Sequence, residues 1–356
     1  MIDIHFENLR HIGLSQYVAN HLGACASASP NALRLMRIVE TQRDWFTLHD
    51  GEAQHRARAA PRLLQALQQH GVGLTVGDWV LAEIHDGLEL WIAERLPPVT
   101  LIARRANDGR RQPLASNVDT ALLAMGLDDD FSPRRMERYI ALVRASDVAP
   151  VVVLTKADIG IDVEVRIAEM RQRLPASVPL VAVNGMSAQA RLELAPWLGA
   201  GQTLVLLGSS GAGKSTLTNT LTGEPLQDTG PVRLGDGRGR HTTTARSLHQ
   251  CPEGACIIDT PGLRTWRPDA DADALAAAFD DIAFLSAQCQ FRDCRHQGEP
   301  GCAVRAGVDG DRLRNYGKLL RDAERGEQSP LERIRQRGKW KALGKAGNAR
   351  ARGKRP

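Results

Sequence analysis

The segment 208–216, with the sequence GSSGAGKST, has the most clearly defined chemistry in the chain. It fits G-x-x-x-x-G-K-[ST], a loop whose backbone N–H groups surround the phosphates of a nucleotide. Lys214 would supply a positive charge to the β- and γ-phosphates, and the hydroxyl of Ser215 is placed for Mg²⁺. The apolar run 203–207 predicts a buried strand before the loop, and 215–221 predicts a helix after it. The predicted phosphate-binding residues are Gly208, Ser209, Ser210, Gly211, Ala212, Gly213, Lys214, Ser215 and Thr216.

A second polar motif, TKAD at 155–158, follows the apolar run 151–154 and indicates which base is bound. It resembles the [NT]-K-x-D element of GTPases, in which the carboxylate accepts two hydrogen bonds from guanine while the lysine stem lies over the base. Adenine offers no matching donors, so Asp158 would leave ATP poorly paired. The predicted guanine-binding residues are Thr155, Lys156, Ala157 and Asp158.

A third motif, DTPG at 259–262, follows the strand-like run 255–258. Such a motif places a carboxylate, here Asp259, near Mg²⁺ and a glycine N–H, here that of Gly262, near the γ-phosphate. Between the phosphate loop and this motif lies GRGRHTTT at 237–244, a polar segment suited to a switch. One of its threonines would close on Mg²⁺ when the γ-phosphate is present; Thr243 is favoured over its neighbours.

The order of these motifs is unusual, because the guanine-binding motif precedes the phosphate loop and DTPG comes last. In most GTPases the phosphate loop comes first. The same sheet can form if the chain is circularly permuted, since the termini of a compact domain often lie close together. The permuted order also places the switch directly before whatever domain follows, to which it would transmit the nucleotide state.

Three cysteines and one histidine form a metal-binding pattern at Cys289, Cys294, His296 and Cys302. Zn²⁺ takes four such ligands tetrahedrally, and the turn residues between them let one loop wrap around the ion. The chain begins without a basic region or long apolar stretch, so a disulfide is disfavoured. Because all four positions are filled by protein, the pattern predicts one structural rather than catalytic zinc ion.

The chain of 356 residues carries a net charge of +5 and 42% hydrophobic residues, enough for two or three domains. No apolar run reaches the length of a membrane span, so a cytoplasmic, membrane-free protein is expected. Short alternating segments between 34 and 105 predict a small β-barrel. Its arginines, and ten basic residues within 331–356, are candidate contacts for RNA phosphates, although solvated surface positions are the alternative for each.

Taken together, these motifs in this order resemble the circularly permuted GTPases called ribosome small subunit-dependent GTPase A, over residues 35–325 and including SNVD at 116–119. One departure is Asn184-Gly185, where the family has Ser-Ala supporting the base. The resemblance implies an α/β P-loop GTPase domain, an N-terminal OB-type β-barrel and a C-terminal helical zinc-binding domain. The expected divisions are 1–33 extension, 34–105 barrel, 106–268 permuted GTPase domain, 269–330 zinc domain and 331–356 basic tail.

The resemblance further implies a monomeric GTP hydrolase that binds the small ribosomal subunit and its 16S-type rRNA, acts in late maturation and is stimulated by the subunit. Its cofactors would be GTP or GDP, Mg²⁺ and one Zn²⁺. Leu263, after DTPG, stands where many GTPases carry a glutamine that orients the attacking water, so intrinsic turnover should be slow. The catalytic candidates are then Lys214, Thr243 and His241, although His241 is equally a candidate rRNA contact.

Two alternative functions remain open at this stage. One is an ATP-dependent P-loop enzyme in which Asp158 has no role in base recognition. The other is a nucleotide-gated rRNA-binding module with vestigial hydrolysis. Nucleotide competition distinguishes the first, and turnover with and without small subunits distinguishes the second.

Overall fold

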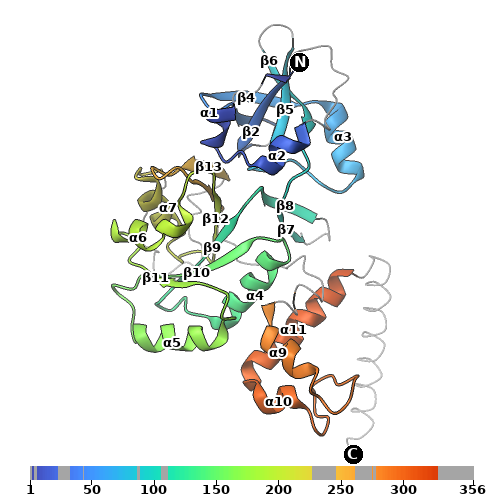
Figure 1. Ribbon diagram of the computed structural model, residues 1–356, viewed down its shortest axis with the longest axis vertical. Helices are drawn as coiled ribbons and strands as arrows, with labels where there is room; N and C mark the ends of the chain where they lie inside the picture. Colours follow the sequence, from blue (N-terminus) through green and yellow to red (C-terminus); the bar gives the residue numbers. More distant parts are fainter. Residues whose placement is uncertain are drawn as a thin grey trace, which may run out of the picture.

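Three regions follow one another along the chain in the computed structural model (Figure 1), which describes residues 2–3, 6–22, 33–42, 44–85, 89–105, 111–226, 246–260, 275 and 278–327. A barrel comes first, a mainly parallel sheet flanked by helices comes next, and a small helical region follows. No helix within the described residues is both long enough and apolar enough to cross a membrane.

The barrel is built from five strands, each with at least one buried side chain: β2 (Leu33–Thr41), β3 (Phe46–His49), β4 (Gln54–Ala59), β5 (Trp79–His85) and β6 (Glu89–Arg95). The pairing order is β2-β3-β4-β6-β5, and β5 pairs again with β2, which closes the barrel. Along the chain, helix α3 (Pro61–Gln69) lies between β4 and β5. Pro61 suits its first turn because that position needs no N–H donor. The predicted small β-barrel is confirmed, and it has five strands.

The central sheet has the order β11-β10-β9-β12-β14-β13. Its members are β9 (Thr120–Gly126), β10 (Ala149–Thr155), β11 (Leu180–Ala182), β12 (Thr203–Gly208), β13 (Ser247–Gln250) and β14 (Cys256–Asp259). All pairings except those of β13 are parallel. β13 also joins the barrel through Ser247, which pairs with Glu40 of β2. A hairpin of β7 (Leu101–Arg105) and β8 (Arg111–Ser116) stands between barrel and sheet.

Helices cover both faces of this sheet, as the nearly continuous burial of β9, β10 and β12 requires. Alternate residues face opposite sides: Leu123 and Val205 belong to one core cluster, whereas Leu122 and Leu204 belong to another. The first cluster is shared with α4 (Pro133–Arg144) and α5 (Val163–Arg173), and the second with α6 (Gln189–Glu193), η1 (Ala195–Trp197) and α7 (Lys214–Thr222).

The helical region after the sheet contains α9 (Asp280–Ser286), α10 (Ala303–Gly307) and α11 (Gly310–Glu327). It lies beside α4 (Figure 1), and its Phe279, Ile282 and Leu319 join the same core cluster as α4. Helix α11 continues through Gly326 to its end at Glu327. A single glycine costs a helix only about 1 kcal/mol, which the rest of an 18-residue helix can absorb.

The segment before the barrel is more ordered than the sequence indicated. It was expected to be an extension with little pattern, but it forms β1 (Ile2–Asp3), α1 (Phe6–Arg10) and α2 (Gln16–Leu22). Leu9, Ile12 and Val18 are almost fully buried in the core shared with the sheet. Helices of five and seven residues are too short for a helical period to stand out in the sequence, so tertiary burial rather than local pattern specifies them.

The first turns of α4 and α5 have no side-chain cap. Ser132 and Asp162 occupy the positions before these helices, but neither side chain makes a capping hydrogen bond. Asp162 instead adopts a left-handed backbone with φ of 52°, a conformation that aspartate tolerates better than most residues.

Candidate nucleotide site and metal centre

All three nucleotide-binding motifs follow the carboxyl ends of parallel strands at one edge of the sheet. TKAD spans the end of β10, the phosphate loop follows β12, and Asp259 ends β14. In open α/β sheets this edge is where ligands bind. Motifs that lie far apart in the permuted sequence are therefore brought to one site by strand order alone.

The phosphate loop runs from β12 into α7 with the backbone geometry that its glycines permit. Gly211 and Gly213 have φ of 86° and 79°, values that strain other residues. A side chain at Gly208 would lie 2.4 Å from the carbonyl oxygen of Ala124 on β9, so the close approach of the two strands requires glycine there. Helix α7 begins at Lys214, which directs its N-terminus and free N–H groups toward the loop.

Lys214 is 93% buried, and its ammonium group donates to the backbone carbonyls of Ser209 at 2.7 Å and Gly208 at 3.1 Å. Burial lowers its pKa, and the carboxylates of Asp259 and Asp130 oppose that shift. The lysine charge is thus held inside the loop by carbonyl dipoles and two nearby acids. Phosphate oxygens are stronger acceptors than carbonyls for such an ammonium group.

The guanine-binding motif is joined directly to the phosphate loop. Thr155 donates its hydroxyl hydrogen to the carbonyl of Ala212 at 2.8 Å, and a side chain at Gly213 would lie 3.3 Å from the same hydroxyl oxygen. Lys156 has φ of 62° and forms a 2.6 Å ion pair with Asp128, which follows β9. Thr155 and Lys156 of the TKAD motif are therefore fixed by contacts within the protein itself.

Asp158 is exposed just beyond β10, where its carboxylate is accessible to a ligand. Ala157 donates its N–H to Val183 at 3.2 Å, which links this turn to the segment after β11. There, at the family's Ser-Ala position, the carbonyl of Gly185 accepts a 2.6 Å hydrogen bond from Thr220 of α7. The departure at Asn184-Gly185 is thus compatible with a backbone that is fixed against the helix following the phosphate loop.

Asp259 is a buried carboxylate whose environment would suit cation binding. It is 1% exposed, and within the part of the chain that the structure describes neither of its carboxylate oxygens accepts a hydrogen bond of normal geometry. Burial raises its pKa to about 6, although the charge of Lys214 and the nearby backbone N–H of Thr260 act in the opposite direction. A buried, unpaired carboxylate is costly, and Mg²⁺ with its waters would satisfy it. Together with Ser215 at the start of α7, it fits the expected Mg²⁺ site.

The remaining predicted site residues, His241, Thr243 and Gly262, lie outside the described residues, as does Leu263. Their predicted roles stay predictions. The same holds for the basic tail 331–356.

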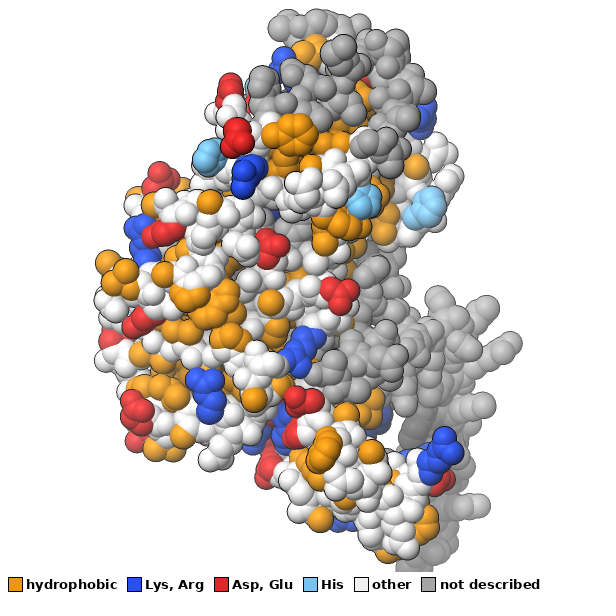
Figure 2. Space-filling view, in the orientation of Figure 1, with side chains coloured by type: hydrophobic (Ala, Val, Ile, Leu, Met, Phe, Trp, Pro, Cys, Tyr) orange, Lys and Arg blue, Asp and Glu red, His pale blue; other side chains and the backbone are white. Residues whose placement is uncertain are grey.

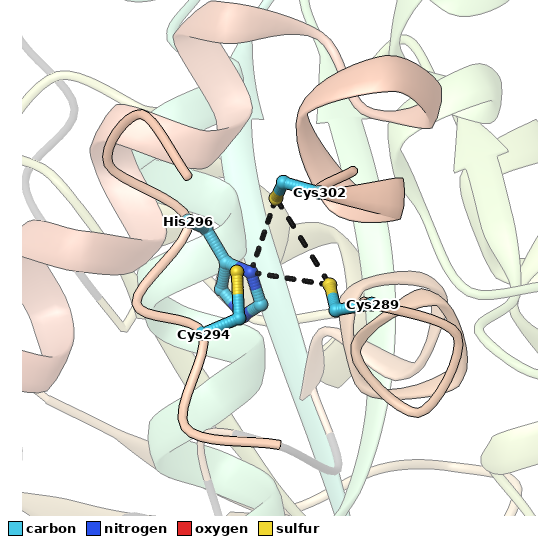
Figure 3. A group of neighbouring side chains, drawn as sticks. All are labelled: Cys289, Cys294, His296 and Cys302. Atoms are coloured by element: carbon cyan, nitrogen blue, oxygen red, sulfur yellow. Dashed lines mark hydrogen bonds between the residues drawn. The ribbon is translucent and has the colours of Figure 1, made fainter. Parts of the chain in front are cut away.

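The four metal-binding candidates converge on one point, as Figure 3 shows. Cys289 and Cys294 follow α9, Cys302 precedes α10, and His296 lies between them. Their ligand atoms all lie within 4.8 Å of one another, with Nδ1 of His296 3.4 Å from Sγ of Cys302 and 3.7 Å from Sγ of Cys289. Tetrahedral ligands about 2.3 Å from zinc are separated by roughly 3.8 Å. The donor set and spacing therefore fit Zn²⁺.

The surroundings of the cluster also fit a metal centre. The other ring nitrogen of His296 lies 3.0 Å from the hydroxyl of Ser286, the kind of partner that orients a ligating imidazole. Hydrogen bonds from the backbone N–H groups of Val304 and Ala303 lower the pKa of Cys289, whereas desolvation raises the pKa of Cys294 to about 11. Zinc binding would have to displace the proton of Cys294. Cys251 and Cys256 are buried elsewhere, in and beside β13 and β14.

Three acidic residues in or before α4 escaped the sequence analysis. Asp128 pairs with Lys156, Asp130 accepts hydrogen bonds from Ser209, and Glu137 accepts one from Arg312 of α11. In sequence the first two are part of an acidic turn, and Glu137 is one polar position in a helix. Only the fold reveals their partners, which lie 28, 79 and 175 residues away.

Comparisons with known proteins agree with the motifs and the fold. The family model described as RsgA GTPase matches residues 96–268. The small ribosomal subunit biogenesis GTPase RsgA of Xanthomonas axonopodis pv. citri (strain 306) is 43% identical over 330 residues, covering 90% of this chain and 89% of the relative. Its namesake in Xylella fastidiosa (strain M23) is 45% identical over 294 residues, covering 80% and 87%.

Two solved structures share the fold. YjeQ from Thermotoga maritima matches with a TM-score of 0.59 at 22% identity, covering 82% of this chain and 98% of that one. YloQ, described as a circularly permuted GTPase, matches with a TM-score of 0.56 at 22% identity, covering 85% and 99%. The predicted fold class, a circularly permuted GTPase with an N-terminal barrel, is confirmed.

Proposed function

The chain belongs to the RsgA GTPase family and is a GTPase, and on that premise we propose that it acts in maturation of the small ribosomal subunit. The observation that carries this proposal is the match to relatives named small ribosomal subunit biogenesis GTPase over 90% of the chain. The match extends beyond the GTPase domain, so the barrel and the helical region are shared as well. We also propose that the protein works as a cytoplasmic monomer, where small subunits assemble.

For the nucleotide site we propose that Asp158 binds the guanine donors, that the loop 208–216 binds the phosphates, and that Ser215 and Asp259 hold Mg²⁺. Bound Mg²⁺ would neutralise charge on the β- and γ-phosphates. Lys214 is buried at the base of the loop, so it can reach phosphate oxygens without crossing solvent. Thr243 and Gly262 would contact Mg²⁺ and the γ-phosphate respectively.

We propose further that hydrolysis is slow in the isolated protein and is stimulated by the small subunit. Leu263 has no group that accepts or donates a hydrogen bond, so the attacking water lacks the usual glutamine. His241 is the candidate within this chain to orient that water, and binding to the subunit would bring it into place.

For rRNA contacts the barrel offers one well-formed candidate. The guanidinium groups of Arg56 and Arg58, both exposed on β4, lie 3.9 Å and 4.2 Å from the ring centroid of Trp45. Such stacking holds two cations on one surface, where they can meet phosphates or unstacked bases. On the face drawn in Figure 2, the described acidic and basic side chains are interspersed.

The proposal is tested by GTP turnover of the purified protein with and without purified small subunits. We expect subunits to raise the rate well above that of the protein alone, and Lys214→Ala to abolish the stimulated rate. Large ribosomal subunits serve as the control partner. Unchanged turnover, together with nucleotide-dependent sedimentation on small subunits, would support the alternative of an rRNA-binding module with vestigial hydrolysis. Unchanged turnover without subunit binding would refute both.

A further inference from the structure

Asp130 is a largely buried carboxylate that belongs to none of the nucleotide-binding motifs. It lies in the turn between β9 and α4, and its side chain is 15% exposed. Both oxygens accept the hydroxyl hydrogen of Ser209, at 2.7 Å and 2.8 Å. The N–H of Gly126 donates to the same carboxylate at 3.3 Å, and the guanidinium of Arg135 pairs with it at 2.6 Å.

Ser209 connects this carboxylate to the lysine of the phosphate loop. Its side chain bonds to Asp130, and its backbone carbonyl accepts the 2.7 Å hydrogen bond from the ammonium of Lys214. One residue of the loop is therefore fixed on one side by Asp130 and contacts the lysine on the other. Asp130 also acts on Lys214 through space, since its negative charge favours the protonated amine in a site where burial disfavours it.

We propose that Asp130 is a positioning residue for GTP binding and hydrolysis, which acts through Ser209 to hold the first turn of the phosphate loop and Lys214 in the phosphate-binding arrangement. Its own described contacts are to Ser209, Gly126 and Arg135, so its proposed effect on the nucleotide is transmitted through Ser209. The carboxylate is required because it accepts from three donors, those of Ser209, Gly126 and Arg135. An amide at this position has one acceptor oxygen and would turn an NH₂ group toward one of those donors.

Asp128, two residues earlier, provides an internal comparison. It lies in the same turn, and one of its carboxylate oxygens accepts a hydrogen bond from the N–H of Asp130 at 3.1 Å. Its ion pair, however, is with Lys156 of the guanine-binding motif and not with the phosphate loop. Asp128→Asn also removes one negative charge from the same turn, so it controls for a general loss of charge there. Only Asp130→Asn removes the contact with Ser209.

The test is a double-mutant cycle measured by GDP and GMP affinity. We expect Asp130→Asn and Ser209→Ala each to weaken GDP about tenfold, the loss of one hydrogen bond to a charged group. The double variant should bind GDP no more weakly than whichever single variant binds it more weakly. GMP lacks the β-phosphate that the loop and lysine bind, so its affinity should change little. Asp130→Glu should recover part of the GDP affinity that Asp130→Asn loses. In the double variant of Asp128→Asn and Ser209→Ala, by contrast, the two fold-losses of GDP affinity should multiply.

The proposal is overturned by three results. One is unchanged GDP affinity in Asp130→Asn, and another is additive losses in the Asp130–Ser209 cycle. The third is an equal loss for GDP and GMP, which would indicate that Asp130 only stabilises the fold. If Asp130→Asn does not fold, Ser209→Ala alone decides the matter, because it must show the same selective loss of GDP. The test uses the isolated GTPase and does not depend on the ribosomal partner.

Discussion

Glu137 of α4 and Arg312 of α11 form a 2.7 Å ion pair in which the two side chains are only 2% and 7% exposed. Asn315 donates a second hydrogen bond to Glu137 at 2.6 Å, and Asp281 binds Arg312 through both carboxylate oxygens. Burial alone would lower the pKa of Arg312, but Asp281 and Glu137 raise it above its usual value. This network attaches the helical region that carries the cysteine cluster to the helix that begins just after the acidic turn of the nucleotide site.

Removing one partner of this pair should be costly. Glu137→Ala leaves Arg312 buried with only Asp281 and leaves Asn315 with only the carbonyl of Arg134 as acceptor, so we expect the free energy of unfolding to fall by about 3 kcal/mol. The double replacement Glu137→Met with Arg312→Met should cost far less, because no buried charge is left unpaired. Urea denaturation measures both. The exposed pair of Arg191 and Glu253 is the control, where Glu253→Gln should cost less than about 1 kcal/mol. A Glu137→Ala loss as small as that control would contradict the expectation.

The sequence predicted the parts of this protein whose patterns are local. The phosphate loop, TKAD and the cysteine cluster have fixed spacings, and the barrel strands such as Trp79–His85 alternate or are bounded by turns. The convergence of the nucleotide-binding motifs could be predicted because the ends of parallel strands share one edge of a sheet. The permuted strand order followed from the order of the motifs together with the family resemblance.

What the sequence could not predict are contacts between residues whose types are common and whose partners are distant. Arg37 is an example: it is fully buried, and its guanidinium donates to Thr203, 166 positions away, and to the carbonyls of Gly77 and Asn117. An arginine in an alternating strand is usually a solvated residue. Here it joins the barrel to the central sheet, and the same reasoning applies to Asp130 and Glu137.

Guanine specificity should depend on Asp158. Asp158→Asn replaces a carboxylate that accepts two hydrogen bonds by an amide with one acceptor, so we expect GDP affinity to fall between 10- and 100-fold, or about 1.5–3 kcal/mol. Xanthine nucleotides offer an acceptor where guanine has its amino group, so they should bind to the Asp158→Asn variant more tightly than to the wild type. Competition titrations measure both. Asp162→Asn is the matched control, because that residue is exposed and its left-handed backbone suits asparagine. Equal binding of ATP and GTP by the wild type would contradict this role.

The cysteine cluster should hold one zinc ion per chain. Cys294→Ser should lose the metal and loosen the region around α9, α10 and α11, since the binding energy of a structural zinc contributes directly to folding. Metal analysis and limited proteolysis measure the two effects. Cys251→Ala, at a buried cysteine outside the cluster, should keep the full zinc content. Freshly purified wild type without zinc, or a Cys294→Ser variant with full zinc, would show that the cluster is not the metal site.

The carboxylate of Asp259 should destabilise the nucleotide-free protein at neutral pH. The same carboxylate should stabilise the protein when Mg²⁺ and nucleotide are bound. Its pKa is about 6 in the folded state, above the ordinary value of 3.8, so the folded state retains a proton that the unfolded chain loses. The contribution of this group to stability is therefore greatest below about pH 4 and is lost as the pH rises through 6. Asp259→Asn removes the buried charge, so the nucleotide-free variant should be more stable than the wild type at pH 8, by about 1–3 kcal/mol, and equally stable near pH 4.

The sign should reverse when Mg²⁺ and GDP are added. The wild type then gains stability by binding, and the variant, which lacks the carboxylate, gains less. Urea denaturation from pH 4 to 8, with and without Mg²⁺ and GDP, measures the whole relationship. Glu169→Gln, on the exposed surface of α5, controls for loss of one acidic charge and should show neither effect. A nucleotide-free Asp259→Asn protein that is less stable than the wild type at pH 8 would mean that the carboxylate is satisfied within the fold, and its assignment to Mg²⁺ would fail.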